Sequence, residues 1–311
     1  MVFKNLLKTS FFFLFLATTI SCSSNDDVQP ESGETFATNV YITDAPSDNP
    51  EAKAVFITVA DVKVNGASLE NFQKTTVEIS SLTNGKTNLL GSLNLKQGAT
   101  SSIELFLDNT TDASGNSPGN YVLTTNAEKK ALATGSGKIV INDKPAIETS
   151  NNNEIVLDFD LRKSIIADGS GNYSFVGNTE LSNSIRAVNA SNTGVLKGKV
   201  SNNSNNKTIV AYVYKKGTYN SSQTEAPNGK ARFSNAVSSS LVSKDNGTFE
   251  IHFLEKGDYE LYFASFSPNS NGKLSFDGKV SATAIGTLNL LNLSIQSNTE
   301  VSVEILLSGI L

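Results

Sequence analysis

Most of the chain consists of short runs in which apolar and polar residues alternate, each closed by a cluster of turn residues. A period of two directs alternate side chains to opposite faces of an extended segment, so these runs predict β-strands. Between residues 36 and 190 we predict strands at 40–43, 54–64, 76–80, 102–108, 138–142 and 154–164.

The second of these runs contains an irregularity. The alternation that runs from Val55 to Val59 continues on the opposite face from Val62. Such a change of face indicates an extra residue in the strand, so we predict a β-bulge near Ala60 and Asp61.

A second series of alternating runs occupies the end of the chain. It comprises GVLKGKV (194–200), TIVAYVYKK (208–216), DNGTFEIHFLEKGDYELYFASF (245–266) and VSVEILL (301–307). Lys256-Gly257-Asp258 divides the third run with turn residues, so we predict a hairpin there. The two series together predict an all-β protein with two β-sandwich-like domains, at 36–190 and 194–311.

The N-terminus has a different pattern. Lys4 and Lys8 precede a short apolar run at 11–17, and small residues lead into Cys22, the only cysteine. That run is shorter than the roughly 20 apolar residues needed to span a bilayer, so we interpret 1–21 as a signal peptide. The sequence TISC resembles a lipobox, which predicts attachment of lipid such as palmitate to Cys22. An ordinary signal peptide with an incidental cysteine is the alternative.

A polar, acidic segment follows the cysteine. It has no hydrophobic periodicity, so 22–35 is predicted to be a disordered tether. Its acidic residues resemble the tag that sends some Gram-negative lipoproteins to the outer face of the outer membrane, and a merely solvated linker is the alternative. Without 1–21, two of the 25 basic residues are lost against 30 acidic ones, which changes the net charge from −5 to −7. An acidic chain without a basic patch is not expected to bind nucleic acid.

Four ordered motifs in the first region resemble an exported prokaryotic family known as domain of unknown function 4382. They are VYITDAP (40–46), SLTNGKTNLLG (81–91), LDFDLRKSI (157–165) and SIRAV (184–188). The resemblance implies a β-sandwich-like domain and no known activity. The runs from 194 onwards resemble the carboxypeptidase-regulatory, transthyretin-like or Cna B-type sandwich, a carbohydrate-binding-like fold. This arrangement of runs is shared by several superfamilies, so it implies a fold rather than a function.

Catalytic chemistry has few candidates. Nucleophilic catalysis of the Ser-His or Cys-His kind needs an imidazole beside the nucleophile, and the chain has one histidine, His252. We interpret His252 as a solvent-facing strand residue on the same face as Glu250. Zinc sites built from His and Cys are excluded by count. We therefore expect neither enzymatic activity nor a resident cofactor.

One acidic cluster is of interest as a metal site. Asp158 and Asp160 lie on one face of a predicted strand, about 6–7 Å apart, and Asp44 is a candidate third carboxylate. Such a set suits Ca²⁺ if other oxygens converge. The alternative is a solvated face partly paired with Arg162, in which Asp44 bonds to its own turn.

Two tyrosines are candidates for ligand binding. Tyr212 and Tyr214 share a face of a predicted strand and could stack on sugar rings; outward tyrosines on an edge strand without any ligand are the alternative.

These features predict a non-catalytic envelope lipoprotein that binds a glycan or another envelope component at the cell surface. The alternative is a structural spacer or assembly component without a small-molecule ligand. A cluster of exposed aromatic residues would favour glycan binding, and a pocket holding two facing carboxylates would favour an enzyme.

Overall fold

The structure is a computed structural model that describes residues 33–45, 52–150, 152–168, 170–202, 207–225, 231–268 and 274–310. The predicted signal peptide, Cys22 and the tether up to residue 32 lie outside these residues. Residues Glu34–Leu311 form one compact unit. Within the described ranges no helix is long and apolar enough to cross a membrane.

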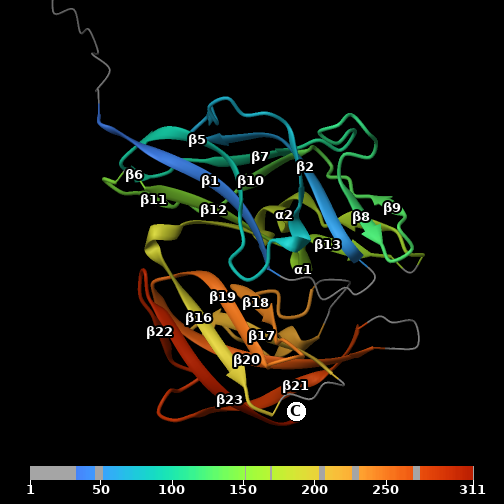
Figure 1. Ribbon diagram of the computed structural model, residues 1–311, viewed down its shortest axis with the longest axis vertical. Helices are drawn as coiled ribbons and strands as arrows, with labels where there is room; N and C mark the ends of the chain where they lie inside the picture. Colours follow the sequence, from blue (N-terminus) through green and yellow to red (C-terminus); the bar gives the residue numbers. More distant parts are fainter. Residues whose placement is uncertain are drawn as a thin grey trace, which may run out of the picture. The chain divides into compact units, whose positions relative to one another are not determined.

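The chain is all-β with a few short helices, as the alternating pattern predicts (Figure 1). A first strand group lies between Thr35 and Asn189, and a second strand group between Thr193 and Ile310. No strand of one group pairs with a strand of the other in the part of the chain that the structure describes. The division into two separate domains stays a prediction.

The first strand group consists of two larger sheets and two short ribbons. Its strands are β1 (Thr35–Ala45), β2 (Ala52–Val64), β3 (Ala67–Ser68), β4 (Thr75–Glu78), β5 (Asn88–Lys96), β6 (Gly98–Ala99), β7 (Ile103–Leu107), β8 (Tyr121–Thr124), β9 (Lys129–Ala131), β10 (Lys138–Ile141), β11 (Ala146–Ile147), β12 (Asn153–Asp160), β13 (Ile165–Ala167), β14 (Tyr173–Phe175) and β15 (Ile185–Asn189). The helices are η1 (Ile79–Ser81), α1 (Leu161–Ser164), α2 (Asn178–Ser184) and η2 (Ala190–Asn192).

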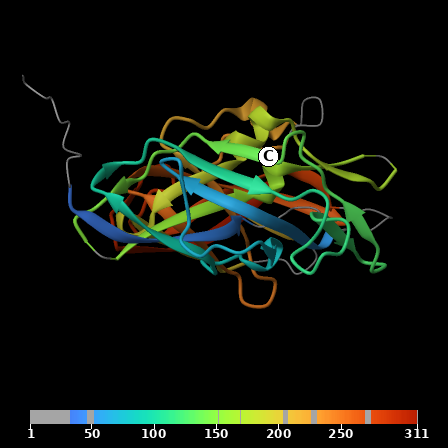
Figure 2. The ribbon, with the colours of Figure 1, turned by 90° about the horizontal axis from the view of Figure 1, so that it is seen from above.

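One sheet has the order β15-β12-β1-β5, and the other runs β10-β7-β2-β8-β9 with β3 and β4 beside β2. Inward-facing Val, Ile, Leu and Phe side chains of both sheets form a single core. The blue and green strands of this group are seen from above in Figure 2. The register of β2 against β7 slips between Val59 and Asp61, which confirms the predicted bulge.

A parallel pairing within this group positions the candidate acidic residues. β1 and β12 run parallel, with Thr43 beside Asp158, Asp44 beside Phe159 and Ala45 beside Asp160. Residues more than 100 positions apart in the sequence therefore end at the same edge of the sheet.

The second strand group is one eight-stranded sheet of order β18-β17-β20-β21-β23-β16-β19, with β22 paired to β20. Its strands are β16 (Thr193–Val200), β17 (Thr208–Lys215), β18 (Ser238–Leu241), β19 (Thr248–Glu255), β20 (Gly257–Pro268), β21 (Leu274–Ile285), β22 (Leu293–Ile295) and β23 (Glu300–Ile310), and it includes the short helix η3 (Ser221–Thr224).

The predicted hairpin at Lys256-Gly257-Asp258 is wrong. β19 pairs with β16, whereas β20 pairs with β17, β21 and β22. The reason is that both strands direct aromatic side chains into the same core. The rings of Phe249 and Phe263 meet edge to face with their centroids 5.7 Å apart, so the two strands face each other across the core instead of lying side by side.

Candidate functional site

Six charged side chains collect where β1, β12 and β15 approach the second strand group. We call this set the junction cluster; its members are Asp44, Asp158, Asp160, Arg162, Lys163 and Arg186. β12 ends at Asp160, whose carboxylate accepts a hydrogen bond from the backbone N–H of Lys163 and so caps the short helix α1. This turn of helix places Arg162 and Lys163 directly after the strand.

The cluster contains buried ion pairs. Arg186 Nη2 lies 2.6 Å from Asp158 Oδ2, and Arg162 Nη2 lies 3.0 Å from Asp160 Oδ2. Lys163 Nζ also approaches Asp160 Oδ2, at 3.1 Å. Burial alone would raise the pKa of Asp160, but the charges of Arg162 and Lys163 outweigh it and lower that pKa.

The same three cations also bind the second strand group, through its backbone. Arg162 donates to the carbonyl oxygens of Arg232 and Phe233, and Lys163 Nζ donates to that of Ala236 at 2.9 Å. Arg186 Nη1 donates to the carbonyl oxygen of Phe253 at 2.5 Å. Each cation therefore joins an aspartate of one group to a carbonyl of the other.

Phe253, whose carbonyl oxygen accepts the hydrogen bond from Arg186, has an unusual backbone conformation. Its φ is +56°, a left-handed value that is uncommon for a residue with a Cβ. The alternation of β19 changes at this point, because Leu254 is buried in the core whereas Phe253 is only partly buried.

Asp44 is the exception within the cluster. Its Oδ1 accepts a hydrogen bond from the backbone N–H of Leu161 at 3.1 Å, whereas its buried Oδ2 has no hydrogen-bond partner. Burial raises the pKa of Asp44 well above its usual value, and the negative charges of Asp160 and Asp158 add to this effect. The ionised form of Asp44 is therefore less favourable than that of an exposed aspartate.

The structure corrects the expectation for the three aspartates. Asp44, Asp158 and Asp160 are all buried, so the predicted solvated face is wrong. Asp44 accepts a hydrogen bond from Leu161, and the turn that follows Ala45 lies outside the described residues, so the expected bond of Asp44 to that turn stays a prediction. The carboxylates of Asp158 and Asp160 face arginine side chains, which neutralise the charge that Ca²⁺ needs. Among the described residues, no group of three or more His, Cys, Asp or Glu side chains could hold a metal ion.

The expectation that Tyr212 and Tyr214 lie outward on an edge strand is also wrong. β17 lies between β18 and β20, and both tyrosines are fully buried. The ring of Tyr212 stacks on Phe233 with centroids 4.2 Å apart and lies 5.3 Å from the guanidinium carbon of Arg162. These rings offer no free face to a sugar.

The single histidine contacts the first strand group. His252 Nε2 lies 2.8 Å from Glu250 Oε2, which confirms that the two share a face, but the ring is only 21 % exposed. Gly85 packs against it so closely that a Cβ there would lie 2.5 Å from Nδ1. The expected solvent-facing histidine is thus partly covered by the Asn84-Gly85 turn.

A small cavity of about 20 Å³ lies beside this contact, lined by Asp44, Asp158, Ser239 and His252 among others. It has room for about one water molecule. The hydroxyl oxygen of Ser239, like Asp44 Oδ2, is buried without a hydrogen-bond partner.

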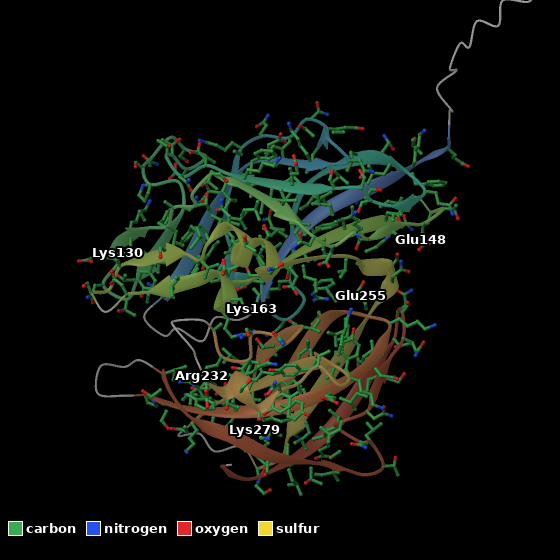
Figure 3. The ribbon with its side chains drawn as sticks, turned by 180° about the vertical axis from the view of Figure 1, so that it is seen from behind. Lys130, Glu148, Lys163, Arg232, Glu255 and Lys279 are labelled. Atoms are coloured by element: carbon green, nitrogen blue, oxygen red, sulfur yellow. The ribbon has the colours of Figure 1, made fainter. Side chains whose placement is uncertain are left out.

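A larger polar cleft of about 600 Å³ opens beside the junction cluster. It is lined by charged, amide and hydroxyl side chains of both strand groups; Lys163 and Glu255, which both line it, are labelled in Figure 3. Its carboxylates all have partners: Asp143 accepts from the N–H of Ala187, Glu255 pairs with Lys215, and Asp158 and Asp160 are paired as above. No two unpaired carboxylates face each other there, as a glycosidase would need.

Sequence reasoning did not reveal that the residues of the junction cluster lie together. Arg186 and Lys163 were parts of the motifs SIRAV and LDFDLRKSI without an assigned role, and Asp44 and Gly85 belong to the other two motifs. All four motifs supply residues that line the junction. The signal available in the sequence was the presence of three cations and three aspartates in motifs that otherwise read as buried strands.

Comparison with known proteins supports the first of the two resemblances. Residues 37–176 match the family model described as Domain of unknown function (DUF4382). No curated protein matches the sequence significantly. The resemblance of 194–311 to transthyretin-like sandwiches stays a prediction.

Several solved structures share a loose likeness. The major pilin subunit BcpA of Bacillus cereus has 12% identity over 89% of this chain and 71% of the pilin, with a TM-score of 0.22. The fimbrial anchor protein Mfa2 from Porphyromonas gingivalis has 13% identity over 76% of this chain and 80% of its own, with a TM-score of 0.18. A leucine-rich repeat protein from Bacteroides thetaiotaomicron has 12% identity over 86% of this chain and 26% of its own, with a TM-score of 0.21. The present chain spans about a quarter of that protein. Similarity at this level carries no argument about function.

Proposed function

We propose that this protein is a lipid-anchored, non-catalytic envelope protein that binds a polar envelope component, a glycan or a neighbouring protein, in the polar cleft. The observation that carries the proposal is the cleft itself, about 600 Å³ in volume and lined by side chains of both strand groups. This volume is in the range of ordinary ligand sites. Because most of the residues that line it have charged, amide or hydroxyl side chains and none is aromatic, the ligand is held by hydrogen bonds and not by stacking on aromatic rings.

The anchor and the location are part of the same proposal. They are supported by the apolar leader and by the position of Cys22, which together indicate export and lipid attachment. The acidic residues after Cys22, which resemble the tag of lipoproteins on the outer face of the outer membrane, support that membrane and the cell surface as the location. Replacing Cys22→Ala should abolish labelling of the protein with palmitate, because the lipid is attached to that thiol. Persistent labelling in the variant would contradict the lipoprotein assignment.

The cleft is tested with Lys215, whose side chain is 60 % exposed at the cleft and pairs with Glu255. Reversing its charge in Lys215→Glu should remove binding of the full-length protein to a glycan array or to purified envelope components. Lys130→Glu is the matched control, because Lys130 also pairs with a glutamate on the surface but does not line the cleft. If both variants bind as the wild type does, the cleft is not the site.

A structural spacer is the second candidate. The buried ion pairs of the junction cluster favour it, because they hold the two strand groups in one arrangement. A wild-type protein that binds nothing in either assay would support the spacer and overturn the binding function.

A further inference from the structure

β20 and β21 pair over only part of their length. Their antiparallel register runs from Pro268 beside Leu274 to Phe263 beside Val280 and stops there. β20 then turns to other partners, since the N–H of Leu261 donates to the carbonyl of Leu290 at 2.8 Å and residues 257–259 pair with β22.

The other strand of this pair continues without it. Residues 281–285 of β21 pair with β23 on one side. On the side that faces β20 they have no strand partner among the residues that the structure describes. An unpaired sheet edge presents backbone N–H and C=O groups that only another extended chain satisfies in sequence.

A groove of about 690 Å³ follows this free edge. One wall is formed by Leu261 and Tyr262 of β20 and the other by residues 280–284, and segment 286–291 also lines it. Leu288 and Leu291 on that segment are 43% and 49% exposed, so they give the groove an apolar wall that no described residue covers fully.

The near absence of charged residues in the groove indicates which kind of ligand it can bind. Residues 280–299 contain no Asp, Glu, Lys or Arg, and Lys279 is the only charged residue that lines the groove. The ammonium group of Lys279 lies 5.4 Å from the ring centroid of Tyr219 and 5.8 Å from that of Tyr262, so aromatic contacts hold it at one end. Exposed edges are ordinarily protected by charges, prolines or bulges. Residues 281–285 carry no charge and no proline, and the register shift of β21 against β23 lies at their start, between Val280 and Ser281.

We propose that the free edge of β21 binds an extended segment of a partner polypeptide by strand addition. The segment is uncharged where it lies along residues 281–285, carries apolar side chains at alternate positions against Leu288 and Leu291, and has an acidic residue at the end beside Lys279. A lipid chain fills the apolar surface but leaves the backbone groups of the edge unpaired, so a polypeptide fits better. This surface is separate from the polar cleft, and the proposal does not depend on a ligand there.

The test uses the full-length protein and a fluorescently labelled synthetic peptide, Glu-Thr-Val-Thr-Val-Thr-Val. Fluorescence anisotropy should show saturable binding, and hydrogen exchange of the amides of residues 281–285 should slow when the peptide is bound. The double variant Leu288→Asp/Leu291→Asp should weaken binding about tenfold or more, since it places charge in the apolar wall. Leu241→Asp is the matched control, because Leu241 is 40% exposed on β18 and does not line the groove. It should bind the peptide as the wild type does.

Three results would overturn the proposal. In the first, the same peptide with N-methylated valines binds equally well, which would mean apolar adsorption without strand pairing. In the second, the amides of 281–285 gain no protection. In the third, sedimentation shows a dimer that Leu288→Asp/Leu291→Asp dissociates, so that a second copy of the chain occupies the groove.

Discussion

The ion pairs of the junction cluster and those on the surface of the second strand group use the same kinds of residue in different surroundings. The side chains of Arg186 and Asp158 are 16% and 6% exposed, whereas those of Lys197 and Glu300 are 38% and 50% exposed. Charges removed from water depend on their partners, because nothing else solvates them, whereas exposed charges are solvated and screened with or without a partner. The comparison teaches that the buried pairs, whose cations also bind the second strand group, should contribute more to the free energy of unfolding than the surface pairs, which lie within that group.

The largest effect is expected from Arg186→Leu. The substitution removes the partner of the buried Asp158 carboxylate and the donor to the Phe253 carbonyl. Breaking a buried pair on one side costs about 3–5 kcal/mol of the free energy of unfolding, which urea denaturation measures. Lys197→Met, which breaks the surface pairs with Glu250 and Glu300, is the contrasting variant and should hardly move the urea midpoint. Equal losses in the two variants would contradict the comparison.

A smaller effect is expected from Gly85→Ala, and Gly66→Ala serves as its control. Both glycines have left-handed φ, +76° and +81°, so each substitution costs about 1–2 kcal/mol of backbone strain. At Gly66 a Cβ meets nothing within 4 Å, whereas at Gly85 it lies 2.5 Å from the ring of His252. The difference in unfolding free energy between the two variants therefore measures the contact with His252. The NMR shifts of His252 should change only in Gly85→Ala, and equal stability losses with an unchanged His252 spectrum would show that this contact is not made.

The smallest effect concerns the pH dependence of stability and Asp44. Because the pKa of Asp44 is raised in the folded protein, its contribution is full below the pKa of an unfolded aspartate, about 3.9, and is lost as the pH rises towards the folded value. Asp44→Asn is neutral at every pH and lacks this loss. The free energy of unfolding of the variant relative to the wild type should therefore increase from pH 4 to pH 7. A constant difference over this range would mean that Asp44 is ionised in the fold.

Much of the first strand group could be predicted because strand formation follows local alternation. The bulge beside Asp61 is an example, since one change of face in the sequence is enough to reveal it. The position of Asp44 beside β12 could not be predicted in this way. It depends on the parallel pairing of β1 with β12, which joins distant segments and leaves no local trace.

The two errors in the second strand group have a related cause. The hairpin was inferred from two strands that are adjacent in the chain, but adjacency does not determine whether such strands pair or face each other across a core. The burial of Tyr212 depends on Phe233, which lies in a polar segment without periodicity. Alternation alone identifies the two faces of a strand but not which face a distant loop covers.

The way in which Arg162, Lys163 and Arg186 bind the second strand group determines which residues this contact constrains. Their acceptors are peptide carbonyls, which every residue possesses, so these hydrogen bonds do not themselves require a particular side chain at 232, 233, 236 or 253. Phe233 is constrained instead by its ring, which is buried against Tyr212. The contact therefore constrains the three cationic side chains of the first strand group more than the side chains of the residues whose carbonyls accept their hydrogen bonds.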